Sequence, residues 1–365
     1  MISRAFDFLS RRIDGPLMAA LALTLALGLT VVYSASGGSS FERAVGQGRN
    51  LAVAVLALWI FAHIHPQALM RLALPAYVAG LGLLLGVALF GEVRNGARRW
   101  LSLGFTTIQP SEVMKIAVPL VLAWYFHRRE EGVRLPDFAI AAVLLAIPVG
   151  LIARQPDLGT ALLIFASGFF VIFLAGLSWK ILVSMGIAGA ASLPFVWSML
   201  HPYQRQRILT LLNPMEDPLG AGYHIIQSTI AIGSGGILGK GWLNGTQAQL
   251  DFVPERSTDF ILAVFGEEFG LAGNVILCVL YLLIIGRGLM IAANASTVFS
   301  RLTAGAITLT FFTYAFVNMG MVSGILPVVG VPLPMISYGG TALLSILVGF
   351  GILMSISTHK QLVSS

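Results

Sequence analysis

Charged residues and cysteine are scarce in this chain of 365 residues. Only 10% of the residues are charged, whereas a soluble globular domain carries about 25%. The sixteen acidic and twenty-two basic side chains are too few to cover a soluble surface of this size, which excludes an ordinary soluble enzyme. The single cysteine, Cys278, excludes an intramolecular disulfide. The six histidines are scattered along the sequence and form no metal-binding motif.

Hydrophobic residues are correspondingly abundant, at 57% of the chain, and the mean hydropathy is +0.87. A helix needs about 20 residues to cross the hydrocarbon core of a bilayer, so ten such helices use roughly 200 residues, a little over half of the chain. We therefore predict an all-α integral membrane protein, a single polytopic domain over residues 1–365 with about ten transmembrane helices. The predicted helices lie near 17–36, 48–63, 70–90, 110–126, 137–153, 158–176, 179–199, 260–285, 303–323 and 337–358.

Basic residues exceed acidic ones by six, and the pI is about 9.7. They gather on no soluble module, which argues against nucleic-acid binding and favours anionic lipid headgroups or a phosphorylated lipid as partners. Ten helices place both termini on one side. Eleven Lys and Arg residues lie there and ten on the other, or six once the four of the longest loop are left out, so the positive-inside rule predicts cytoplasmic termini. Arg4, Arg11 and Arg12 give the N-terminus the layout of a signal peptide, but the apolar run is too long for one, and we expect an uncleaved first helix.

Two stretches interrupt the helical pattern. Residues 200–259 form a large outer loop between the seventh and eighth helices, in which apolar alternation predicts a short amphipathic or re-entrant helix near 223–232. Residues 324–340 contain three prolines, which prevent a regular helix. Irregular backbone at the membrane is tolerated where protein buries it or where it lines a cavity. The alternative for this second stretch is a tight outer turn.

The run from Ser234 to Gly241 superficially resembles a phosphate-binding loop. The Walker A motif requires glycine at the first position and serine or threonine at the last, and neither is present. No strand precedes the run, so we do not expect nucleotide binding.

Charged residues in or beside the apolar runs are the main candidates for function. Glu112 and Lys115, at i and i+3 near the start of the fourth helix, form either a pair facing a polar cavity or a pair that snorkels to the surface. Asp259 stands at the start of the eighth helix, capped by Ser257 or Thr258, where an acid also complements the helix dipole.

Two further acids, Glu267 and Glu268, lie two turns deeper in the eighth helix than Asp259. An acid inside a membrane helix indicates function by default. The alternative is a buried packing pair with a hydroxyl group or an arginine.

The outer segments resemble the SEDS family of cell-wall proteins in sequence and in order along the chain. The matching stretches are 99–100, 109–115, 155–160, 213–228, 233–242, 244–247, 252–260 and 332–340. The 324–334 segment is more similar to the elongation members of the family than to the division members.

This resemblance implies a peptidoglycan glycosyltransferase of cell elongation and rod-shape maintenance that polymerises lipid II in the bacterial inner membrane. It implies ten transmembrane helices, a class B penicillin-binding protein as transpeptidase partner, and other elongation-complex proteins. The aspartate of the motif Pro-Glu-Arg-Ser-Thr-Asp, Asp259 here, is the family's proposed catalytic residue, and Glu112 with Lys115 matches a polar pair in the fourth helix.

The expected chemistry agrees with these residues. Converting an α-linked diphosphate donor into a β-1,4 product inverts the anomeric carbon, which requires one base for the acceptor hydroxyl. Asp259 is the candidate base; alternatively it binds a divalent cation, Mg²⁺ or Mn²⁺, and no other cofactor is indicated. The diphosphate leaving group needs neutralisation by cations. The candidates for this role are Lys115, Arg205, Arg207, Lys240 and Arg256.

The backbone conformation at Arg205 and Arg207 determines whether one or both of them can contact phosphate. They point about 200° apart on a helix but share a face in extended chain. If the seventh helix continues through them, at most one contacts phosphate; otherwise both do, or they bind lipid headgroups.

Two other functions remain open from the sequence. A lipid II flippase needs polar residues through the full membrane thickness, whereas here they gather at the outer face. A non-catalytic scaffold of the cell-wall machinery needs no Asp259.

Overall fold

The computed structural model of the protein describes residues 12–37, 41–94, 97–102, 107–130, 132–155, 157–200, 202–218, 220, 222–250 and 252–359. Within these ranges, ten helices of 17 to 33 residues correspond one to one to the predicted membrane helices. They are α2 (Gly15–Ala35), α3 (Phe41–His63), α4 (Pro66–Phe90), α5 (Pro110–His127), α6 (Leu135–Ala153), α7 (Leu158–Leu174), α8 (Trp179–Met199), α12 (Ile261–Ala293), α13 (Val298–Val322) and α14 (Gly340–Thr358). The prediction of an all-α membrane protein is confirmed.

Eight of these helices are long and apolar enough to cross a membrane. The other two are α7, which has 17 residues, and α5, which carries Glu112 and Lys115 in its first turns. Both pack against α13 inside the bundle, so their neighbours help to bury them. About ten spans therefore describe the arrangement well.

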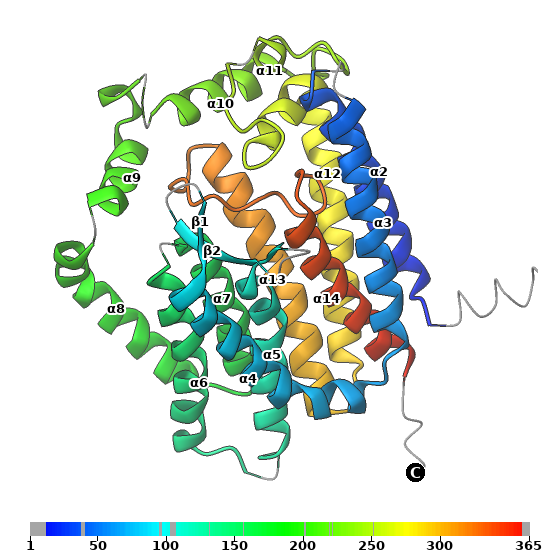
Figure 1. Cartoon of the computed structure of the whole chain (residues 1–365), viewed down its shortest axis with the longest axis vertical. Coiled ribbons are helices and arrows are strands. Elements are labelled where there is room, and N and C mark those ends of the chain that lie inside the picture. The colour runs from blue at the N-terminus through cyan, green and yellow to red at the C-terminus, as the bar shows by residue number, and fades with distance from the viewer. Residues whose placement is uncertain are drawn as a thin grey trace, which may run out of the picture.

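The helices lie side by side in an elongated bundle (Figure 1). The long loop, with the short helices α9 (Pro202–Leu212), α10 (Tyr223–Ser234) and α11 (Thr246–Gln249), covers one end. At the other end the carboxylate of Asp14, which caps α2, accepts hydrogen bonds from Arg287 Nε and Nη2 at 2.9 and 2.8 Å and from Ser357 Oγ at 2.7 Å. The first and last helices thus meet at one end, called the termini end below, opposite the loop end.

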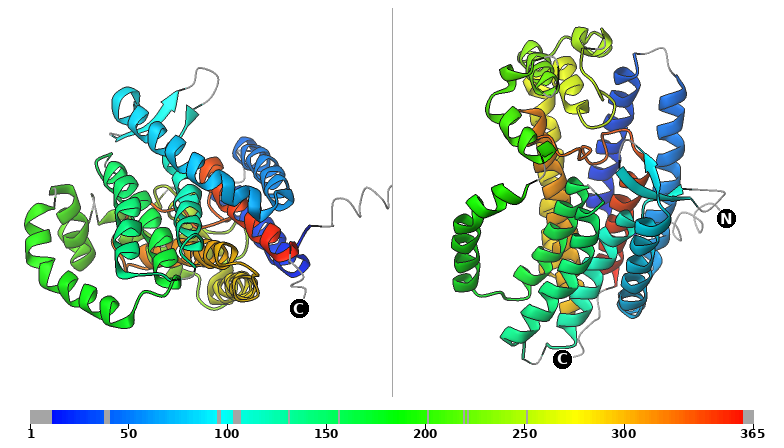
Figure 2. Two further views of the ribbon diagram at one scale, coloured as in Figure 1. Left: turned by 90° about the horizontal axis from the view of Figure 1, so that it is seen from below. Right: turned by 60° about the vertical axis from the view of Figure 1, so that its left-hand side comes forward.

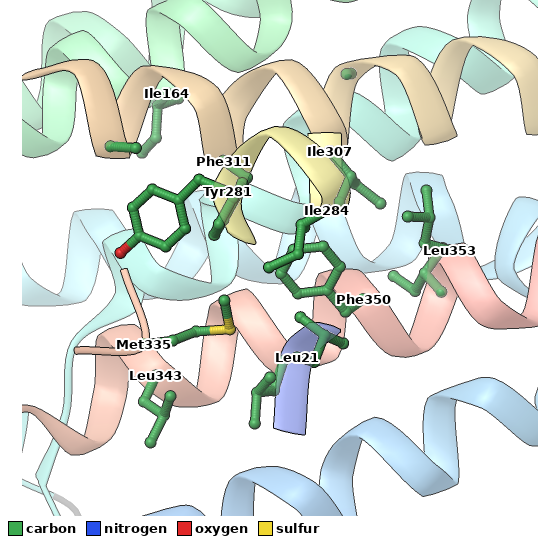
Figure 3. Close-up of a cluster of buried hydrophobic side chains, with 14 of the residues drawn as sticks. Leu21, Ile164, Tyr281, Ile284, Ile307, Phe311, Met335, Leu343, Phe350 and Leu353 are labelled. Carbon is green, nitrogen blue, oxygen red and sulfur yellow. The ribbon is translucent and has the colours of Figure 1, made fainter. Parts of the chain in front are cut away.

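Aromatic and branched side chains fill the centre of the bundle (Figure 3). Phe311 of α13 makes edge-to-face contacts, with ring centroids 5.2 Å apart, to Tyr281 of α12 and to Phe350 of α14. Such pairs add about 0.5–1.5 kcal/mol beyond the area they bury. This core joins the three C-terminal helices to Leu21 of α2.

Helix α8 stands away from the bundle, and none of its residues is buried (Figures 1 and 2). The chain then turns into α9, which begins at Pro202, as suits a residue that lacks a backbone N–H. The predicted helix near 223–232 is confirmed as α10, whose residues Ile225, Ser228 and Ala231 are buried.

A small antiparallel sheet was not expected from the sequence. Strands β1 (Glu92–Arg94), β2 (Ala97–Ser102) and β3 (Thr107–Ile108) lie between α4 and α5, in the order β1-β2-β3. Strands β1 and β3 have only three and two residues, and the six residues of β2 include two arginines, so the sheet gives no alternating apolar signal.

Helix α12 is broken at Gly270, where φ is 64° and ψ is −161°. The break releases backbone groups on both sides, and residues 236–241 of the long loop bind them. The amides of Lys240 and Gly241 donate to the carbonyls of Glu267 and Glu268, both at 3.0 Å. The amides of the next two residues after the break, 271 and 272, donate to the carbonyls at 236 and 237, both at 2.9 Å.

This contact explains the glycine-rich run that resembles a phosphate loop. A side chain at Gly270 would collide with the backbone nitrogen of Gly239, and a side chain at Gly239 would collide with the carbonyl of Glu268. The glycines let two backbones approach closely, which is a structural role.

The segment 323–339, called the strap below, folds back among the helices. Val331, Leu333 and Ile336 are buried, and the Tyr281 hydroxyl donates to the Pro334 carbonyl at 2.6 Å. The backbone at Met335 sits directly against Gly28 of α2. Of the two alternatives for this stretch, buried irregular backbone is therefore correct, and a tight outer turn is wrong.

The break in α12 yields a stability prediction. Gly270→Ala should lower the melting temperature, because this backbone conformation costs a non-glycine residue about 1–3 kcal/mol and because the methyl group would displace the 236–241 run. The matched control is Gly286→Ala in the same helix, where an added Cβ meets nothing within 4 Å and alanine favours helix. Thermal unfolding in detergent measures both, and equal melting temperatures would contradict the interpretation.

Candidate functional site

Asp259 lies where the long loop enters α12. The helix begins at Ile261 with Phe260 at its N-cap and no side-chain cap, so Asp259 stands just before the helix and not in its first turn. The expected capping by Ser257 or Thr258 is wrong, because the Thr258 hydroxyl donates instead to the Glu255 carboxylate at 2.8 Å and carbonyl at 3.2 Å. The segment is therefore a compact turn closed by Glu255.

The strap and α13 hold this turn by hydrogen bonds to its backbone carbonyls. The amide of Tyr338 donates to the Ser257 carbonyl at 2.8 Å, and the Ser337 hydroxyl donates to the Thr258 carbonyl at 2.6 Å. Asn318 Nδ2 donates to the Asp259 carbonyl at 2.9 Å. Three consecutive carbonyls are thus bound by donors from the strap and α13.

The Asp259 side chain is held close to the strap. A Cβ at Gly330, where φ is +74°, would stand 3.4 Å from its Oδ2 atom. Burial, reinforced by the negative charge of Glu255 and opposed by the positive charge of Arg207, raises the pKa of Asp259 to about 6. A carboxyl group with this pKa is still mostly ionised at neutral pH and is suited to accept a proton.

Glu112 and Lys115 form a buried ion pair inside the bundle. Lys115 Nζ donates to Glu112 Oε1 at 2.6 Å, and the hydroxyl of Ser345 from α14 donates to Oε2 at 2.7 Å. The ammonium group also lies 5.1 Å from the ring centroid of Tyr314 on α13. Their side chains are 13% and 6% exposed, and Lys115 and Ser345 line a cavity of about 30 Å³. The pair is therefore largely enclosed by the bundle, with only the Glu112 side chain slightly exposed.

Helix α13 relates this pair to Asp259. Tyr314 faces Lys115, and Asn318, one turn further toward the loop end, binds the Asp259 backbone. Four helical residues span about 6 Å. Glu112, Lys115 and Asp259 thus belong to one polar region at the loop end.

Glu267 and Glu268 are fully buried acids that anchor the long loop. Glu267 accepts hydrogen bonds from Lys240 Nζ at 2.7 Å, Thr246 Oγ1 at 3.0 Å and the backbone amide of residue 247. Glu268 accepts one from the Ser34 hydroxyl of α2. The packing alternative for these acids, with hydroxyl groups and a cation as partners, describes what is seen. The Lys240 ammonium group is therefore paired with Glu267.

The two arginines of α9 point to different partners, as expected for alternate positions on a helix. Arg205 Nη2 donates to the Ser198 carbonyl at the end of α8 at 2.6 Å. Arg207 is exposed, and its charge acts on Asp259. Arg256 lies half-buried in the Asp259 turn. Arg207 is therefore the long-loop cation best placed beside Asp259.

Several polar contacts at this end were not expected from the sequence. Asn318 and Ser337 bind the Asp259 turn, and Asp157, the N-cap of α7, lies 3.7 Å from Arg99 of β2. Asn318 sits inside an apolar run, so an uncharged amide in a membrane helix was the signal to find it.

Within the described ranges, no group of three or more His, Cys, Asp or Glu side chains is placed to hold a metal ion. Asp259 and Glu255 are nevertheless close enough for their charges to interact. Mg²⁺ in phosphate-binding enzymes requires only one or two protein carboxylates, with substrate phosphates completing its shell. A cation held here would take Asp259 as a protein ligand and phosphate oxygens for most of its other ligands.

Comparison with known proteins identifies the family. The family model for cell cycle proteins of the FtsW, RodA and SpoVE type matches residues 16–362 of this sequence. The chain belongs to this family. It is 51% identical over 355 residues to the peptidoglycan glycosyltransferase MrdB of Escherichia coli strain K12, covering 96% of this chain and 95% of MrdB.

Two solved structures have the same fold. One, described as a peptidoglycan synthase complex that coordinates polymerization and crosslinking, contains a chain 36% identical to this one, with a TM-score of 0.81 and coverage of 94% of this chain and 97% of that chain. The other is the rod shape determining protein RodA of Thermus thermophilus, 29% identical, with a TM-score of 0.72 and coverage of 96% and 98%. The predicted resemblance to the elongation branch is confirmed.

The buried ion pair yields a second prediction. Lys115→Met should destabilise the protein by about 3–5 kcal/mol, because Glu112 would remain buried without its cation. The double variant Glu112→Gln, Lys115→Met leaves no charge and should cost less. Thermal unfolding measures both, with Glu130→Gln, which removes an exposed partner of His127, as a near-neutral control. A double variant less stable than Lys115→Met would contradict the assignment.

Proposed function

We propose that this protein is a peptidoglycan glycosyltransferase of cell elongation that polymerises lipid II, with Asp259 as its base. The observation that carries the base assignment is a single carboxylate, held by its backbone at the loop end, whose burial raises its pKa to about 6. Membership of the family and the similarity to a named peptidoglycan glycosyltransferase support the choice of reaction.

In the proposed reaction the Asp259 carboxylate removes the proton from the acceptor 4-hydroxyl group. The oxygen forms a bond to the anomeric carbon of the donor sugar, and the bond from that carbon to the diphosphate oxygen breaks. Undecaprenyl diphosphate leaves with the electron pair, and the proton stays on Asp259 until solvent removes it. The anomeric carbon inverts, which gives the β-1,4 linkage.

The leaving diphosphate needs positive charge more than it needs a proton. Arg207, exposed beside Asp259, and Arg256 in the same turn are the arginines best placed to supply it. Lys115, enclosed with Glu112, contributes positive potential from inside the bundle. Arg205 and Lys240 bind protein groups, so their proposed contact with phosphate requires those bonds to be exchanged.

The loop end is proposed to face the periplasm and both termini the cytoplasm, in agreement with the distribution of Lys and Arg. The sequence has no transpeptidase motif. We therefore propose a class B penicillin-binding protein as partner, with its single helix on the lipid-facing side of the bundle, alongside other elongation-complex proteins.

The alternatives differ in what they require. A lipid II flippase needs a polar path through the whole membrane, whereas Glu112, Lys115 and Asp259 share the loop end and Asp14 is paired with Arg287 at the termini end. A scaffold requires no ionised Asp259. An assay of lipid II polymerisation therefore distinguishes a glycosyltransferase from a flippase or a scaffold.

Asp259→Asn should abolish glycan synthesis from labelled lipid II by the purified protein with its partner, because the isosteric amide cannot accept the proton. Melting temperature and co-purification of the partner should remain at the parental level and serve as controls for folding. Polymer formed at the parental rate by Asp259→Asn would refute the assignment. Loss of parental activity in EDTA, with recovery in Mg²⁺ or Mn²⁺, would indicate that Asp259 acts as a metal ligand.

The raised pKa predicts the pH dependence. A base must be ionised, so the polymerisation rate should rise as pH increases through about 6. Glu255→Gln removes a negative charge that raises the pKa of Asp259 and should move this limb to lower pH. Arg207→Ala removes a positive charge that lowers the pKa of Asp259, so it should move the rise of the rate to higher pH. Identical profiles for all three proteins would contradict the electrostatic account.

A further inference from the structure

Asn318 is a fully buried amide in the loop-end half of α13. Its Nδ2 group donates to two carbonyl oxygens at once, that of Asp259 at 2.9 Å and that of Val331 at 2.7 Å. One side chain therefore connects α13, the turn that carries Asp259 and the strap. The strap directly follows α13 in the sequence, whereas Asp259 lies 59 residues before Asn318, and all three elements meet at this amide.

The orientation of the amide is fixed by its partners. Carbonyl oxygens only accept hydrogen bonds, so the nitrogen of Asn318 must face both of them. The two N–H groups of the amide match the two acceptors in number. An aspartate, a leucine or an alanine at this position supplies no such pair of donors.

The arrangement also leaves one group unsatisfied. Asn318 Oδ1 is buried and has no hydrogen-bond partner among the described residues. An unpaired buried acceptor costs about 1–3 kcal/mol. An apolar side chain of similar size would avoid this cost but would remove the donors to two carbonyls, so the benefit of the amide comes from the two carbonyls it holds.

We propose that Asn318 is a positioning residue for catalysis, which fixes the carboxylate of Asp259 by binding the carbonyl of the same residue. This inference rests on the proposed role of Asp259 as base. Asn318 contacts no reacting atom and acts through the backbone. The donors from the strap to the Ser257 and Thr258 carbonyls fix the preceding peptide groups, while Asn318 fixes the last one before α12 begins.

The position of a base is critical to its rate. A displacement of about 1 Å reduces a rate by up to about 100-fold. Without Asn318 the Asp259 carbonyl loses the donor given by α13, and this residue is no longer fixed against α13, although the strap still binds the Ser257 and Thr258 carbonyls. The Asp259 side chain then gains contact with water, which lowers its pKa toward the value of a free aspartate.

The test uses the full-length protein with its partner and labelled lipid II. Asn318→Leu keeps the volume and removes both donors, and Asn318→Ala removes them with the side chain. Both should reduce kcat by about 10- to 100-fold with an unchanged KM for lipid II. Both should also shift the acid limb of the pH profile to lower pH, a change that general loss of folded protein does not produce.

The matched control is Thr308→Val in the same helix. Thr308 is 1% exposed, and its hydroxyl donates to the Ala304 carbonyl of its own helix at 2.8 Å. It lies ten residues, or about 15 Å, from Asn318 toward the termini end. It should retain the parental kcat and pH profile even where its melting temperature falls.

Parental kcat in Asn318→Leu would overturn the inference, as would a loss of kcat with an unshifted acid limb. If neither Asn318 variant yields monodisperse protein, Ser337→Ala carries the test, since it removes the neighbouring donor to Thr258; parental kcat there would overturn the inference too. Asp259→Asn is measured in parallel. Activity in that variant refutes the proposed function itself, whereas an inactive Asp259→Asn beside a fully active Asn318→Leu refutes only the positioning role.

Discussion

The need to hydrogen-bond every backbone group inside a membrane governs the loop end of this protein. Where the chain is helical the requirement is met locally, but α12 breaks at Gly270 and the strap has no regular structure. In hydrocarbon an unpaired N–H or C=O group costs several kcal/mol. Other parts of the chain must therefore supply partners. The 236–241 run does so for α12, and α12, α13 and the Asp259 turn do so for the strap.

The hydrogen bonds that satisfy these irregular segments also order the region around the candidate site. The 236–241 run that binds α12 includes Lys240, whose ammonium group pairs with Glu267 and fixes the middle of the long loop. The strap that needs donors for its own carbonyls in turn supplies donors to the turn of Asp259. The backbone hydrogen bonds of the irregular strap thus give the turn that carries Asp259 a fixed position.

The sequence was informative wherever one property repeats locally. Apolar runs of about 20 residues predicted ten helices because membrane insertion depends on local hydropathy, and alternation near 223–232 predicted α10. The position of Asp259 came from a motif. The break at Gly270, the path of the strap and the role of Asn318 were not predictable in this way, because each depends on a contact between residues distant in sequence. The pairing of Lys240 with Glu267 belongs to the same class, since neither position alone specifies its partner.

The distribution of cations gives the loop end its chemical character. Lys240 and Arg205 hold the loop, and the exposed Arg207 acts on the charge of Asp259. Burial and Glu255 favour the protonated form of Asp259, and Arg207 opposes them, so that the pKa settles near 6. At pH 7 a group with that pKa is about nine-tenths ionised, since one pH unit is a factor of ten. Without burial the carboxylate would be a weak base, and without a nearby cation it would be protonated more often. A base is most effective when its pKa lies near the working pH, and here that balance depends on opposed contributions from residues 255 and 207 around one partly buried carboxyl group.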